Sequence, residues 1–387
     1  MVRRGSRREE ILDAAAHLFA RRGFDGVSLA DLADTVGVTA PALYRHFSDK
    51  EAILTSLIEA TAQRMVGIAE ARQDDPDALA SCVAAYTAEA LDRPDPALTY
   101  LRERHRLRGD AAAGRVALER ALLDLLVRPY SRAYPKLDGT DMLHRVIGAL
   151  GALRGCAERG VRIPRPAADE FVAGGVLALL AAPAASAPVR PATRSPGWTP
   201  EQSPRERILG AALPLFRERG FAGVGFGEIG EVAGVGATNV GRYFDSKEQI
   251  LVDAYDRAGA KVEVGLDEAI GTAADAKDAL DRMLESYCRL AFDSVDLVVV
   301  VSDNRGALPS EERPRLRRRD RRVMALWRAV VAEVRPDLRP TEVDTAVAAV
   351  LPIINMFPQQ LHGSVPAPES VITLVRAFVL GVKPQRR

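Results

Sequence analysis

The chain has 387 residues and carries 53 Lys and Arg against 52 Asp and Glu, which gives a formal net charge of +1. This length suits roughly two to four domains. With 47% apolar and 27% charged residues, the composition excludes a disordered or fibrous protein. The balanced charge also excludes a polycation that coats nucleic acid, so any DNA binding must come from a locally shaped surface.

Cysteine spacing and apolar stretches narrow the class of protein further. Cys82, Cys156 and Cys288 are scattered and form no C-x-x-C pair, which supports neither a zinc site nor a disulfide framework. The longest nearly uncharged apolar stretch, 171–182, is too short for a bilayer that needs about twenty residues. The N-terminus lacks the apolar run of a signal peptide. We therefore expect a cytoplasmic protein with no metal site and no membrane contact.

In chain order, the first predicted elements are four helices. A capping box at Ser6–Glu9 precedes apolar residues at helical spacing, and Gly23 is expected to end this helix. Ser28–Asp31 begins a short second helix and Thr39 begins a third. A box at Ser48–Glu51 is expected to cap a long fourth helix.

This stretch is repeated later in the chain. Residues 6–54 align with residues 203–251 at a constant offset of 197, without a gap and with 23 identities in 49 positions. The segment 183–202 between the copies is rich in proline and lacks apolar periodicity, which is typical of a semi-rigid linker. The sequence therefore predicts a tandem duplication, with boundaries at 1–54, 55–182, 183–202, 203–251 and 252–387.

The remainder of each half also has helical periodicity. Val298–Val301 alone has the composition of a strand, but a single strand among helices would have no partner. The predicted fold class is all-α. No nucleophile triad, phosphate loop or paired-carboxylate signature occurs, so we expect no enzymatic activity and no cofactor.

A helix, a tight Gly-containing turn and a second helix form the helix-turn-helix arrangement, whose second helix fits the DNA major groove. The first copy predicts this helix over 39–47, with Ala40, Leu43 and Phe47 spaced to face the core. Small apolar side chains can touch thymine methyl groups, and hydroxyls and cations can reach phosphates or base edges. The residues left for such contacts are Thr39, Pro41, Ala42, Tyr44, Arg45 and His46, with Lys50 beside a phosphate at the next helix N-terminus.

The pattern G-V-T-A-P-A-L-Y-R-H-F-x-x-K-E, after G-F-x-G-V-S-L-x-x-L-A, resembles the TetR family of bacterial transcriptional regulators. The resemblance covers about 50 residues in each half. It implies a three-helix DNA-binding unit at 1–54 and 203–251, and variable helical effector-binding and dimerisation domains at 55–182 and 252–387. It further implies backbone contacts from Ser28, Thr39, Tyr44, His46 and Lys50, and a base-reading stretch formed by Ala40, Pro41, Ala42 and Arg45.

The second copy departs from this pattern. Gly225, Gly236 and Gly241 stand where the first copy has Ser28, Thr39 and Tyr44, which weakens two caps and the predicted recognition helix. Pro214 is expected to bend or break the preceding helix. The contacts that remain are Thr238, Asn239, Arg242, Tyr243 and Lys247. Asn239 suits adenine, and whether this copy binds DNA is left open.

The leading hypothesis is a transcriptional regulator that represses until a small, largely apolar effector releases it from a double-stranded operator. Both subunits of the family dimer would lie in one chain, with 142–160 and 171–182 packed against 341–361 and 368–382. One alternative is a homodimer that reads a palindrome with the first copy only. Another is a helical ligand- or protein-binding module whose motifs no longer bind DNA. The ligand-binding residues are not assigned; Tyr100, Trp327, Asn355, Met356 and Phe357 fit a plain core better than a pocket.

Overall fold

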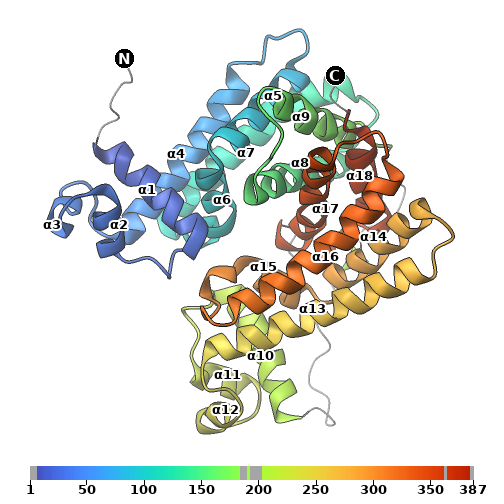
Figure 1. The fold of residues 1–387 in the computed structure, drawn as a ribbon. Coiled ribbons are helices and arrows are strands. Elements are labelled where there is room, and N and C mark those ends of the chain that lie inside the picture. Colours follow the sequence, from blue (N-terminus) through green and yellow to red (C-terminus); the bar gives the residue numbers. More distant parts are fainter. Residues whose placement is uncertain (1–6, 184–189, 192–202, 361–363, 384–387) are drawn as a thin grey trace.

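The computed structural model describes residues 7–183, 190–191, 203–360 and 364–383 (Figure 1). Within these ranges the chain forms eighteen α-helices, two short 3-10 helices and one pair of two-residue strands. The all-α prediction is confirmed, and Val298–Val301 lies within a helix. The two strands, β1 (Arg190–Pro191) and β2 (Ser364–Val365), pair antiparallel.

Nine helices form the first half. They are α1 (Arg7–Arg22), α2 (Leu29–Val36), α3 (Ala40–Leu43), α4 (Lys50–Glu70), α5 (Ala78–Asp92), α6 (Pro94–Glu103), α7 (Gly109–Ala133), α8 (Gly139–Arg159) and α9 (Ala167–Leu180), with the 3-10 helix η1 (Arg104–Arg106) after α6. Among the described helices, none is long and apolar enough to cross a bilayer.

The second half repeats this order. Its helices are α10 (Pro204–Arg219), α11 (Phe226–Val232), α12 (Ala237–Tyr243), α13 (Lys247–Gly271), α14 (Ala276–Asp293), α15 (Val295–Asp303), α16 (Arg313–Val334), α17 (Pro340–Gln360) and α18 (Pro368–Gly381), with η2 (Arg305–Ala307) after α15.

The structural repeat extends far beyond the 49 residues that align in sequence. Helices α8 and α17 both have 21 residues, and their bounds differ by 201 at each end. Helices α9 and α18 both have 14 residues and also differ by 201 at each end. The offset grows from 197 to 201 because α13 has 25 residues and α4 has 21. The repeat in the order of the helices therefore spans the whole of each half.

Short polar interactions set the helix boundaries around the repeated motif. Ser28 and Asp31, which were expected to begin the second helix, form a capping box at the start of α2, and Gly23 and Gly37 adopt left-handed φ angles of 73° and 71° where α1 and α2 end. The predicted cap of α4 is one residue off, because Asp49 rather than Ser48 accepts the Ala52 N–H, at 2.7 Å. The Ser6 cap lies outside the described residues.

Pro214 does not break its helix, which corrects the expectation from the sequence. Helix α10 continues from Pro204 to Arg219 with Pro214 inside it. A proline ring normally crowds the carbonyl four residues earlier and leaves it without a donor. Here that residue is Gly210, which is exposed and has open space around it, so water can reach the carbonyl.

The two halves pack along α8 and α9 of the first half and α17 and α18 of the second, at the centre of the molecule (Figure 1). These are the four segments that were predicted to meet. Helix α8 lies directly against the backbone of α17, since a Cβ placed on Gly151 would be 2.6 Å from the Ile353 Cα, and one on Gly155 would overlap the Ala348 carbonyl oxygen. One apolar core crosses the junction, and it includes Ile147, Cys156, Val350 and Phe357.

Candidate DNA-binding surface and ligand cavity

The first helix-turn-helix unit is organised around a core of its own. Leu43 and Phe47 are buried as predicted, together with Ile11 and Phe19 of α1. Helix α3 is shorter than expected and ends at Leu43. The chain then tightens into a turn, in which the His46 and Phe47 N–H groups both donate to the Leu43 carbonyl, at 2.9 and 3.0 Å.

The predicted contact residues of this unit lie on its outer face. Tyr44 is 57% exposed, and Ala42 is half-buried. The other exposed candidates are Ser28, Thr39, Pro41, Arg45 and His46. The side chain of Ala40 lies outside the described part of the structure. An exposed face of this composition can meet phosphates and base edges.

Lys50 has a structural partner that the sequence did not reveal. Its ammonium donates to the carbonyls of Phe24 and Val27, both at 2.9 Å, and lies 4.2 Å from the centre of the Phe24 ring. Burial lowers the pKa of this ammonium. Lys247 repeats the arrangement in the second half. Lys50 therefore holds the start of α4 against the turn after α1. Because an ammonium has three donors, these two carbonyls leave one donor for any other contact.

The second unit keeps a complete recognition helix despite its glycines. Helix α12 runs for seven residues, against four in α3, with Gly241 exposed inside it. Gly225 has no capping side chain, but its N–H donates to Glu228 at 3.0 Å, which preserves half of the capping box. Val240 and Phe244 are buried. The exposed contact candidates are Thr238, Asn239, Arg242 and Tyr243, and Lys247 is half-buried.

A cavity of about 800 Å³ lies in the first half, between the DNA-binding unit and α5–α9. Its wall is mostly apolar, with leucines from α4, α5, α7 and α8 and the side chains of Cys82, Tyr86 and Tyr100. Such a volume and lining suit a small, largely apolar ligand. Of the five residues weighed for a pocket, Tyr100 lines this cavity, whereas Trp327, Met356 and Phe357 are core residues.

One part of the cavity wall is charged. Glu119 accepts a hydrogen bond from the Tyr100 hydroxyl at 2.6 Å and pairs with Arg104 and Arg115, both at 2.5 Å. Burial raises the pKa of this carboxyl, but these three partners outweigh it and hold the pKa below its ordinary value. Burial raises the pKa of Tyr100 far above its ordinary value. Glu119 is therefore ionised at neutral pH and Tyr100 is not.

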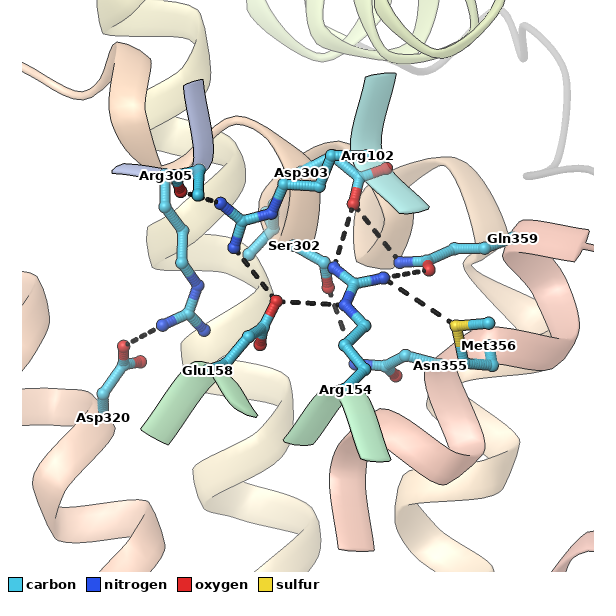
Figure 2. A network of polar contacts seen from close by, with 12 residues as sticks. Arg102, Arg154, Glu158, Ser302, Asp303, Arg305, Asp320, Asn355, Met356 and Gln359 are labelled. Atoms are coloured by element: carbon cyan, nitrogen blue, oxygen red, sulfur yellow. Dashed lines mark hydrogen bonds and ion pairs between the residues drawn. The ribbon is translucent and has the colours of Figure 1, made fainter. Parts of the chain in front are cut away.

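A polar network joins the cavity wall to the second half (Figure 2). Arg154 of α8 lines the cavity, and its guanidinium donates to Gln359 at 2.6 Å and pairs with Asp303 at 3.4 Å. The Glu158 carboxylate accepts hydrogen bonds from the guanidiniums of Arg154 and Arg102, both at 3.0 Å. Burial raises the pKa of Glu158, but the two guanidiniums lower it more, to about 2. This network was not predicted, because its members lie far apart in the sequence.

Known proteins match the chain in its two helix-turn-helix units. The family described as bacterial regulatory proteins, tetR family, matches at residues 11–57 and again at residues 208–254. The HTH-type transcriptional repressor AcnR of Corynebacterium diphtheriae is 40% identical over 62 residues, which are 16% of this chain and 33% of that protein. The HTH-type transcriptional repressor KstR2 of Rhodococcus jostii is 36% identical over 64 residues, 16% of this chain and 31% of that protein.

The chain thus aligns with about one third of the length of these curated relatives. Among solved structures, the ketosteroid transcriptional regulator KstR2 of Mycobacterium tuberculosis is similar at 18% identity and a TM-score of 0.43, covering 50% of this chain and 100% of that one. Each half of the chain thus contains one segment that matches the tetR family of bacterial regulatory proteins, which supports the tandem duplication.

Proposed function

We propose that the chain is a DNA-binding transcriptional repressor that reads a pseudo-palindromic operator and is released by a small, largely apolar effector. The observation that carries this proposal is the pair of exposed recognition faces in one chain, with Arg45 and Arg242 at equivalent positions. The helices α3 and α12 lie at separate outer ends of the molecule (Figure 1). A cytoplasmic location follows from the proposal, because the operator is there.

The two halves act, in this proposal, as the two subunits of a dimer within one chain. The central packing of α8 on α17 and α9 on α18 supports this arrangement. Residues 1–54 and 203–251 would bind DNA, and 55–182 and 252–387 would carry effector binding and pairing. Residues 183–202 would connect the halves. The proposed contacts are the exposed candidates of α3 and α12 named above, with Lys50 and Lys247 reserved chiefly for holding each unit together.

The effector site of this proposal is the cavity between α1 and α5–α9. It touches α1 through Leu12, α4 through Leu57 and α6 through Leu98. Helices α1 and α4 also belong to the core of the first DNA-binding unit. A ligand that pushes these helices apart would change the angle of that unit, which supplies a direct route from binding to release.

The test is to select bound sequences from a random duplex pool with the purified full chain. We expect two dissimilar half-sites, separated by about one helical turn (34–36 Å) or a multiple of it. The variants Arg45→Ala and Arg242→Ala should each weaken binding to the selected duplex about fivefold or more, since one good base contact is worth about 1–3 kcal/mol. Arg282→Ala, at an exposed position of α14, is the control and should bind normally.

Other outcomes separate the alternatives. A perfect palindrome, with binding that Tyr44→Ala abolishes and Arg242→Ala leaves intact, would indicate homodimers that use only the first copy. Because α12 is intact, we favour DNA binding by both helix-turn-helix units over this outcome. No enrichment at low salt, where phosphate contacts are strongest, would leave a helical binding module in place of a regulator.

A further inference from the structure

The duplication allows the ligand cavity of the first half to be compared with the same place in the second. Helices α5–α9 correspond to α14–α18, and the constant offset of 201 matches residues one to one from α7 to α9. The turns after α7 and α16 share it, since Leu137 N–H donates to Tyr134 and Leu338 N–H donates to Arg335. In α5 and α14 the same offset pairs Tyr86 with Tyr287.

At two positions that line the cavity in the first half, the second half carries a larger and fully buried side chain. Leu126 lines the cavity, and its counterpart Trp327 is completely buried. Cys82 lines the cavity as well, and its counterpart is Met283, also completely buried. The Trp327 indole nitrogen has no hydrogen-bond partner among the described residues, so this side chain contributes volume rather than a polar contact.

The helices that carry these residues differ in the same way. Helix α7 buries only Pro129 and Tyr130 among its 25 residues, and Leu123 is 39% exposed. Its counterpart α16 buries six of its 22 residues, and Met324, which corresponds to Leu123, is 4% exposed. Helix α7 therefore forms one wall of a cavity, whereas α16 packs against a filled core.

One polar contact differs between the halves in the same way. In the second half the Tyr287 hydroxyl bonds to Asn355 at 3.1 Å, which links α14 to α17 across the interior. In the first half the counterpart Tyr86 donates to the Met65 carbonyl at 2.7 Å, and Arg154 turns toward the second half. The bond that closes the second half is thus absent from the corresponding pair in the first.

We propose that effector binding is confined to the first half, because Trp327 and Met283 fill the corresponding space in the second half and leave no room for a ligand. One apolar ligand per chain then governs two DNA-binding units. This inference deepens the proposed function and rests on it for the identity of the ligand as an effector. The cavity and its filled counterpart are properties of the fold and do not depend on DNA.

The experiment exchanges the equivalent residues between the halves. The probe is anilinonaphthalene sulfonate, titrated into the full chain and followed by fluorescence and calorimetry. We expect one probe molecule per unmodified chain. The variant Cys82→Met/Leu126→Trp should lose probe affinity at least tenfold, and should also unfold at a higher temperature because it fills a cavity. Met283→Cys/Trp327→Leu should gain a second probe site.

Either of two results would overturn the proposal: two equivalent probe sites in the unmodified chain, or unchanged binding in Cys82→Met/Leu126→Trp. An unmodified chain that binds no probe would overturn it as well. If Met283→Cys/Trp327→Leu fails to fold, as circular dichroism would reveal, the filling variant still decides. Because the titration contains no DNA, failure of the duplex selection would leave its result intact, and the two proposals can fail separately.

Discussion

Glu158 is the carboxylate that holds Arg154, the residue whose guanidinium reaches the second half. Its pKa of about 2 lies below the ordinary 4.5, so the unfolded chain takes up a proton first as the pH falls. The stabilisation is complete above pH 4.5 and is lost as the pH falls toward 2. Removing the carboxylate leaves the guanidiniums of Arg154 and Arg102 without their shared partner.

We therefore expect Glu158→Gln to lower the free energy of unfolding by about 2 kcal/mol at neutral pH, because the buried charge of Arg154 loses a partner. Between pH 4.5 and 2 the variant should lose less stability than the unmodified chain. Urea unfolding across this range measures both effects. Glu170→Gln, at an exposed position of α9, is the control. Equal pH profiles for the unmodified chain and Glu158→Gln would contradict the assignment.

The sequence predicts residues that belong to a local motif and misses residues whose partners lie far away in the chain. Tyr44, Arg45 and Arg242 could be placed because a motif and its repeat are local signals. Glu158 could not, since its partner Arg102 comes from α6, and Asp303 of α15 joins the network through Arg154. The pairing of Leu126 with Trp327 was missed as well. It becomes visible only when the offset between the halves has changed from 197 to 201, at the end of α13.

At the scale of elements, close contact between α8 and α17 depends on glycine. The Gly155 Cα faces the Ala348 carbonyl and the Ala349 backbone, with no room for a side chain. That these helices meet was expected from the family resemblance, which implies a dimer within one chain. Their separation could not be predicted, because it depends on which residues face each other.

Gly155→Ala should lower the free energy of unfolding by about 2–4 kcal/mol, because an added methyl group must push two backbones apart. Gly174→Ala is the matched control, since it lies within a helix with nothing nearby and should be neutral or stabilising by about 0.5–1 kcal/mol. Thermal unfolding compares the two variants. A neutral Gly155→Ala would mean that α8 and α17 are not in direct contact.

At the scale of the whole molecule, both halves lie in one chain, so pairing does not require a second copy. We expect a solution mass near 41.8 kDa that does not change with protein concentration. Sedimentation equilibrium over a wide concentration range measures it. A mass near twice this value, with no monomer on dilution, would contradict the single-chain arrangement and favour homodimers.

The glycine contact between α8 and α17 also determines which surfaces can pair at all. Gly151 and Gly155 of α8 correspond to Pro352 and Met356 of α17, so a slender helix meets a bulky one. The contact is therefore asymmetric: the glycines that allow the close approach come from α8, and the larger side chains come from α17. A second copy of α17 placed where α8 lies would bring Pro352 and Met356 to the positions that Gly151 and Gly155 leave open.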